Sequence, residues 1–160
     1  MKKALVAYFS ATGATKRIGD MLAESIGAKT FEIVPKELYT NADLDWTNDN
    51  SRSSQEMKDR ASRPEIESHV RDIKDYDVIF LGFPIWWYRE PSIIDTFVEK
   101  HDFNGKLIVP FATSGGSPIA DSYKGIATLA PKAKVERGKV FDSGVEPEEL
   151  KKWADRYLRK

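Results

Sequence analysis

The sequence predicts a three-layer α/β protein, in which a doubly wound, open parallel sheet of five strands is covered by helices on both faces. Short continuous apolar runs alternate with stretches whose apolar residues recur at helical spacing, which is typical of strand–helix–strand crossover units. Of the 160 residues, 41% are hydrophobic and 31% are charged, an ordinary globular composition. We find no internal repeat, and we expect a single domain over residues 1–160.

The first part of the chain supplies two strands and a long polar segment. Residues 4–9 form a short apolar run, which we expect to be a buried strand rather than the core of a signal peptide. A helix is predicted from about Thr15, with Gly27 as its C-terminal stop, followed by a strand over 30–34. Residues 36–62 are polar and lack a convincing period, so we expect a long loop excursion there.

Regular structure is predicted to return after this excursion. Residues 62–65 have the spacing of a capping box with proline in the first turn, which predicts a helix with Ile66, Val70 and Ile73 facing the core. Residues 78–81 predict the third strand. The apolar pattern then predicts a helix from near Pro91, a strand over 107–112, a helix over 119–129, a short strand near Val135 or Val140, and a last helix from Pro147.

Composition excludes several classes of function. The 25 Lys and Arg residues balance the 25 Asp and Glu residues, so no global field attracts nucleic acid or a membrane surface, and we expect neither as a partner. The absence of cysteine excludes thiolate nucleophiles and iron–sulfur clusters, so redox chemistry requires a bound cofactor. No metal site is predicted. No apolar run approaches the roughly 18 residues of a membrane helix, and we expect a cytoplasmic protein.

The loop after the first strand predicts a phosphate site. In doubly wound sheets, ligands bind at the carboxyl ends of the strands. Here three hydroxyl groups and a glycine stand on a tight turn that opens a helix, so backbone N–H groups and the helix dipole favour an anion. A hydroxyl-rich helix cap is the alternative. The candidate residues are Ser10, Thr12, Gly13, Ala14 and Thr15.

The loop after the third strand is rich in aromatic residues. It contains Pro84, Ile85, Trp86, Trp87 and Tyr88. Aromatic side chains in a loop need a partner, and a flat ring system would stack on them, which predicts a ligand wall. The alternative is that some of them belong to the core or to a protein-contact patch.

The loop after the fourth strand is made of small residues. Thr113, Ser114, Gly115 and Gly116 offer backbone N–H groups that can lie against the edge of a ring and donate to its carbonyl groups. A generic glycine turn before a helix is the alternative for this loop taken alone.

Together the three loops resemble those of the flavodoxin family. The chain is similar to short flavodoxin-like proteins marked by S-x-T-G-x-T after the first strand and P-x-W-W after the third, and the similarity runs from about Lys3 to the last helix. The resemblance implies the strand order 2-1-3-4-5 and non-covalent FMN, with its phosphate in the first loop and its ring between the other two. The chain departs from the pattern in two places: Ala14 stands where the family often has Asn, and Tyr88 and Arg89 follow the paired tryptophans where it usually has Gly.

Two functions from different classes stay open. In the first, the protein is an FMN-dependent oxidoreductase that takes hydride from NAD(P)H and passes it to a quinone or a similar flat acceptor. In the second, it is a non-enzymatic carrier between redox protein partners. A formal net charge of zero gives no global steering of a protein partner, so we favour the enzyme, with no catalytic residue of its own because the flavin carries the chemistry. A decayed FMN site is a weaker third reading, and both a monomer and a homodimer stay open.

Overall fold

The protein was analysed as a computed structural model, which describes residues 2–114, 119 and 122–159. No helix in these residues is both long and apolar enough to cross a bilayer. In chain order the elements are β1 (Ala4–Tyr8), α1 (Ala14–Ile26), β2 (Lys29–Glu32), α2 (Arg52–Lys58), the 3₁₀ helix η1 (Ile73–Asp75), β3 (Val78–Pro84), α3 (Ser92–Glu99), β4 (Leu107–Thr113), α4 (Ser122–Leu129), β5 (Lys134–Val135), β6 (Lys139–Val140) and α5 (Pro147–Leu158).

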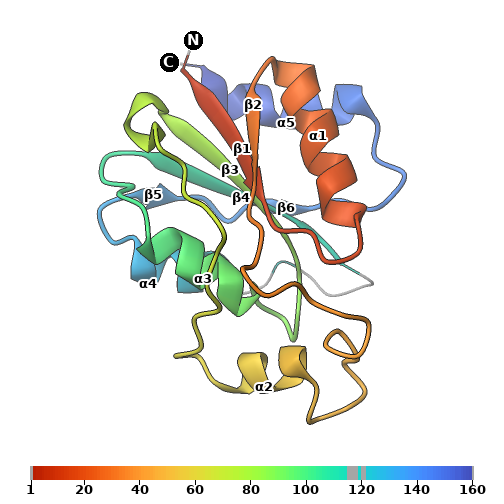
Figure 1. Ribbon diagram of the computed structural model, residues 1–160. Helices are drawn as coiled ribbons and strands as arrows, with labels where there is room; N and C mark the ends of the chain where they lie inside the picture. The colour runs from red at the N-terminus through yellow and green to blue at the C-terminus, as the bar shows by residue number, and fades with distance from the viewer. Residues whose placement is uncertain (1, 115–118, 120–121, 160) are drawn as a thin grey trace.

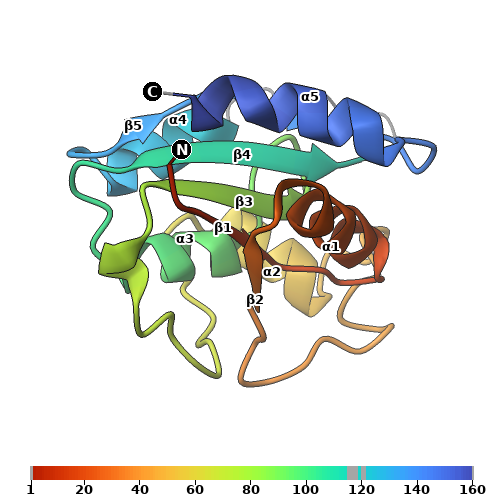
Figure 2. The same cartoon turned by 90° about the horizontal axis from the view of Figure 1, so that it is seen from above.

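The strands form one parallel sheet in the order β2-β1-β3-β4-β5, which confirms the predicted topology. Figure 1 shows α1 and α5 on one face of the sheet and α3 and α4 on the other, and Figure 2 shows the fan of strands from β2 to β5. Because all strands run the same way, the loops after β1, β3 and β4 meet at one edge of the sheet.

Alternation along each central strand builds two cores. Because side chains of a strand point to opposite faces in turn, every second residue packs under a different pair of helices. The core that includes residues of α3 and α4 contains Leu5, Ala7, Phe9, Ile79, Leu81 and Phe83. The core that includes residues of α1 and α5 contains Val6, Tyr8, Val78, Phe80, Val109 and Phe111.

The fifth strand of the sheet is divided into two short pieces. β5 pairs with β4 at Leu107 and Ile108, and β6 pairs with β4 at Phe111 and Ala112. Val135 and Val140, the two alternative positions predicted for a short strand, therefore both lie in strands. The break between them contains Gly138, where a Cβ atom would lie 2.1 Å from the carbonyl oxygen of Pro110, so only glycine allows this approach.

The predicted helix after residues 62–65 is wrong. Instead, this stretch extends beside the end of β2: the N–H of Lys36 donates to the carbonyl oxygen of Glu65 at 2.9 Å, and the N–H of Glu67 donates to that of Val34 at 2.7 Å. Since the backbone groups are already paired in this way, they cannot also form helical hydrogen bonds. Ile66 and Val70 are buried without a helix, and only η1 follows.

The polar segment over residues 36–62, called the excursion below, contains the helix α2, which its composition did not predict. The Ser51 side chain accepts a hydrogen bond from the N–H of Ser54 and caps this helix. In Figure 1, α2 lies beyond the carboxyl ends of the central strands, at the bottom of the view. The excursion is therefore placed at the edge of the sheet where the three loops meet.

Replacing Gly82 of β3 with alanine is expected to destabilise the protein by roughly 1–3 kcal/mol, because an added methyl group overpacks the core. A Cβ atom at Gly82 would lie 2.2 Å from Cζ of Phe111 on the neighbouring strand. Urea denaturation measures the change. A double variant with Phe111→Leu removes the clash and is expected to recover part of the loss, whereas an unchanged midpoint for Gly82→Ala would contradict the packing.

Candidate functional site

The first loop leaves the start of α1 open to a ligand. Gly13 precedes the helix in a left-handed conformation with φ 98°, and no side chain caps the helix start. The N–H of Gly13 donates to Ser10 Oγ at 3.0 Å, while Thr12 and Ala14 are exposed. The first turn carries no acidic residue. The free N–H groups and the helix dipole therefore favour an anion here.

A buried pair of threonine hydroxyls joins the first loop to the end of β4. Thr15 Oγ1 and Thr113 Oγ1 lie 2.8 Å apart, and both side chains are buried. Next to them lies a cavity of about 440 Å³, whose walls come from all three loops: Thr12 and Ala14, residues 84–86, and Thr113 and Ser114. The structure thus brings some predicted residues of each loop around one space, whereas Ser10, Gly13, Thr15, Trp87 and Tyr88 do not line it.

The loop after β3 forms a tight turn in which two bulky residues adopt positive φ. Trp86 and Arg89 exchange two backbone hydrogen bonds of 3.0 and 3.1 Å. Between them, Trp87 has φ 47° and Tyr88 has φ 65°. Residues other than glycine pay of order 1 kcal/mol or more for this conformation. Their side chains are 44% and 65% exposed, so the strain holds two aromatic rings toward the outside of the protein.

Trp86 has a structural role that the other two aromatic residues of this turn lack. Its ring packs edge-on against Phe9 at 5.7 Å and against Tyr39 at 5.5 Å between ring centroids. This cluster ties β1, the excursion and the turn together. Trp86 therefore packs against the core, as the alternative for this loop allowed, yet it is only partly buried and still lines the cavity, while Trp87 and Tyr88 are exposed.

A second cavity of about 600 Å³ opens beside the turn. Residues 85–88 and Ser114 form one part of its wall, and the excursion contributes Leu44, Trp46 and Ser53. It shares Ile85, Trp86 and Ser114 with the first cavity, so the two spaces adjoin. Sequence reasoning missed the three excursion residues. The one available signal was Trp46, a large aromatic side chain in an otherwise polar segment.

The excursion is held against the turn by a chain of contacts around Tyr39. The Tyr39 hydroxyl donates to Glu56 Oε1 at 2.5 Å, and Arg52 Cζ lies 3.8 Å from the centroid of the Tyr39 ring. Arg52 Nε also donates to Glu56 Oε2 at 2.9 Å. Burial, together with the hydrogen bond to Glu56, raises the pKa of Tyr39, so the phenol keeps its proton and its role as a donor.

The residues present fit the FMN that the resemblance implies. An uncapped helix start with no acidic residue in its first turn suits a phosphate, and an adjoining cavity walled by aromatic side chains suits a flat ring. Arg17 lines the first cavity and donates to the carbonyl oxygen of Ser143, and Asp142 lines it as well, so the wall carries one cation and one carboxylate. Gly115 and Gly116, which were predicted to lie at the ring edge, fall outside the described residues.

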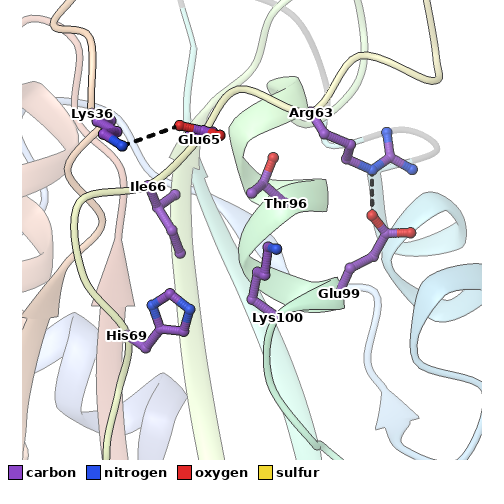
Figure 3. A pocket seen from close by; sticks show the side chains of 8 residues that line it. All are labelled: Lys36, Arg63, Glu65, Ile66, His69, Thr96, Glu99 and Lys100. Carbon is purple, nitrogen blue, oxygen red and sulfur yellow. Dashed lines mark hydrogen bonds and ion pairs between the residues drawn. The ribbon is translucent and has the colours of Figure 1, made fainter.

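A cavity of about 510 Å³ elsewhere on the molecule lacks these features. It lies between α3 and the segment that follows the excursion, and Figure 3 shows its lining side chains. Lys36 Nζ is 3.5 Å from Glu65 Oε2, and Arg63 Nε is 2.5 Å from Glu99 Oε1, so these charges pair within the wall. No aromatic wall and no helix start faces this space among the described residues, and we do not assign it a ligand.

Comparison with known proteins agrees with this geometry. A solved structure from Bacteroides eggerthii, of a protein designated a flavoprotein, is 44% identical, with a TM-score of 0.93 and coverage of 100% of both chains. The flavoprotein from Lactobacillus acidophilus, solved in complex with FMN, is 23% identical, with a TM-score of 0.73 over 96% of this chain and 99% of that one, which shows a shared fold.

Among curated proteins, Flavodoxin 1 of Escherichia coli is 34% identical over 61 residues, which are 36% of this chain and 35% of that protein. The chain thus matches about a third of the length of these curated relatives. A family model described as flavodoxin matches residues 3–157, nearly the whole chain. The chain belongs to the flavodoxin family.

Proposed function

We propose that this protein binds FMN in the two adjoining cavities and uses it to move electrons. The backbone N–H groups at the start of α1 and the hydroxyl of Thr12 hold the phosphate, and Trp87, Tyr88 and Ser114 border the ring. Bound FMN supplies the redox chemistry, because it accepts a hydride or single electrons that no side chain of this cysteine-free protein can take.

The reaction that the site supports best is transfer from NAD(P)H to a quinone or a similar flat acceptor. One observation carries this proposal: no charged side chain lines the 600 Å³ cavity among the residues that the structure describes there. Carriers that shuttle electrons between proteins gain speed from charged rims that steer a partner. An uncharged aromatic mouth instead favours a small flat molecule, which buries its faces against rings.

Steady-state kinetics of the FMN-loaded protein test this proposal. Oxidation of NADH and of NADPH is followed with a soluble benzoquinone as acceptor. Saturable quinone-dependent turnover is the expected result. If the protein shows no such turnover, yet passes electrons from a ferredoxin–NADP reductase to cytochrome c, it is a carrier and the enzyme proposal is wrong.

Replacing Trp46 with alanine is expected to lower kcat/KM for the quinone by roughly three- to tenfold, because one aromatic contact with the acceptor is lost. The FMN dissociation constant is measured beside it, because Trp46 lines the same 600 Å³ cavity as Trp87 and Tyr88, and a loss confined to FMN affinity would place Trp46 at the flavin rather than at the acceptor. Leu38→Ala is the matched control: Leu38 is 67% exposed and Trp46 72%, both lie in the excursion, and only Trp46 lines the cavity. If the two substitutions lower kcat/KM equally, Trp46 does not contact the acceptor.

A further inference from the structure

A buried cluster of charged side chains lies directly behind the aromatic turn. Glu90 follows the turn and is 0% exposed, and Arg89 and Asp95 are buried beside it. Arg89 Nη1 lies 3.2 Å from Asp95 Oδ2 and 3.5 Å from Glu90 Oε2, and Arg89 Nη2 donates to Ser92 Oγ at 3.1 Å. The helices α3, which carries Asp95, and α4 lie side by side (Figure 1), and neither candidate cavity includes the cluster.

Two carboxylate oxygens of this cluster lack a partner. Glu90 Oε1 and Asp95 Oδ1 are buried and accept no hydrogen bond from the residues that the structure describes. Two ionised carboxylates cannot bond to each other, because neither has a donor. A proton on the Glu90 carboxyl group changes this, since the protonated group donates to the neighbouring Asp95 carboxylate. Unsatisfied buried polar atoms are costly, so this protonation state is favoured.

The charge balance of the cluster points the same way. The charged groups facing Glu90 are Arg89, Asp95 and Arg63, and Arg63 also pairs with Glu99. With every group ionised, two guanidinium groups meet three carboxylates and one buried negative charge is left over. One proton makes the set neutral. Burial, followed by the hydrogen bond to Asp95, raises the pKa of Glu90 to about 9.

The cluster is also fixed from the α4 side. A Cβ atom at Gly125 would lie 2.7 Å from Glu90 Oε2, so α4 packs directly on the carboxyl group. Ser122, three residues earlier on the same face of the helix, has a buried hydroxyl with no partner among the described residues. Glu90 is therefore enclosed between the Arg89–Asp95 side of the cluster and α4. Water does not solvate a negative charge on its carboxyl group.

We propose that Glu90 is a positioning residue of the flavin site: its carboxyl group carries a proton at neutral pH, donates it to Asp95, and thereby keeps Arg89 seated and the turn over residues 86–89 in its ligand-facing conformation. This proposal rests on the proposed function, because it assumes that the turn borders FMN. Its physical basis is the connection between the two features: Arg89 closes the strained turn with its backbone and anchors the buried cluster with its side chain.

The protonation state is tested by ¹³C NMR of the FMN-loaded protein labelled at glutamate carboxyl carbons. Glu90→Gln removes one resonance and so assigns it. That resonance is expected to stay unchanged through neutral pH and to shift near pH 9. If it titrates together with the exposed glutamates, the proposal is wrong. Should Glu90→Gln fail to fold, Gly125→Ala identifies the resonance instead, because the new methyl group displaces the Glu90 carboxyl group.

Stability gives a second, independent measurement. A pKa raised from 4.5 to about 9 means that the folded protein keeps the Glu90 proton over a range in which the unfolded chain has released it. The contribution of Glu90 to stability is therefore complete below pH 4.5 and is lost as the pH rises toward 9. Relative to Glu90→Gln, the unfolding equilibrium constant of the wild type is expected to rise about tenfold per pH unit within this window. A constant ratio would contradict the proposal.

The positioning role is tested by the FMN dissociation constant as a function of pH. The ratio of wild-type to Glu90→Gln values is expected to rise roughly tenfold as the pH passes 9, because ionised Glu90 unseats the turn. Taking the ratio cancels the titration of FMN itself. If FMN binds and the ratio stays flat, Glu90 has no positioning role and the proposed function stands. If neither protein binds FMN at any pH, the proposed function fails first.

Discussion

Replacing Ala14 with aspartate is expected to weaken FMN binding by at least about 100-fold, because a carboxylate is placed beside the phosphate site. The carboxylate acts in opposite directions on FMN binding and on folding, and its effect on binding is the large one. At an effective dielectric constant near 20, like charges about 4 Å apart repel by about 4 kcal/mol. In the protein without FMN, the same carboxylate interacts favourably with the helix dipole in the first turn of α1. The free energy of unfolding is therefore expected to stay equal or rise.

Ala14→Asn is the matched control for this substitution. It has nearly the same size and no charge, and the exposed position accommodates it. Its affinity for FMN is expected to equal or exceed that of the wild type, since its amide adds a donor near the phosphate. Binding is measured by quenching of FMN fluorescence. If Asp and Asn weaken binding equally, the phosphate does not lie at the start of α1.

Replacing Arg52 with alanine is expected to release the excursion from the aromatic turn. The Arg52–Glu56 pair is mostly buried. Removal of Arg52 leaves the Glu56 carboxylate without its charge partner, which costs about 3 kcal/mol. The stacking on Tyr39 is lost as well. Because these contacts are local, amide hydrogen exchange over residues 36–62 is expected to become about 100-fold faster, while exchange in the central strands changes little.

Lys36→Ala serves as the comparison for Arg52→Ala. Lys36 also pairs with a carboxylate, but both Lys36 and Glu65 are exposed, and exposed pairs contribute at most about 1 kcal/mol. Uniform exchange changes across the molecule in Arg52→Ala would mean that the excursion does not open on its own.

The sheet and the convergence of the loops could be predicted because their signals are local. The runs over 4–9, 78–81 and 107–112 are apolar on both faces, and a buried parallel strand is the element that such runs fit. Once the strand order is known, the loops after β1, β3 and β4 must meet.

The excursion could not be predicted in the same way. The helix α2 has no apolar stripe, with Met57 as its one buried hydrophobic residue, and it depends on the Ser51 cap and on the contacts of Arg52. Ile66 and Val70 have helical spacing, yet an extended segment paired with the end of β2 buries them equally well. The buried acid Glu90 was missed because nothing in its sequence neighbourhood shows that α4 covers it.

The division of the fifth strand affects how the protein behaves at high concentration. A long, regular edge strand offers unpaired N–H and carbonyl groups. Other chains can form hydrogen bonds with these groups, which is the first step toward fibrils. Here that edge consists of two dipeptides separated by Gly138. Another molecule therefore finds no continuous template on this side of the sheet, and self-association by strand addition is disfavoured by the backbone itself.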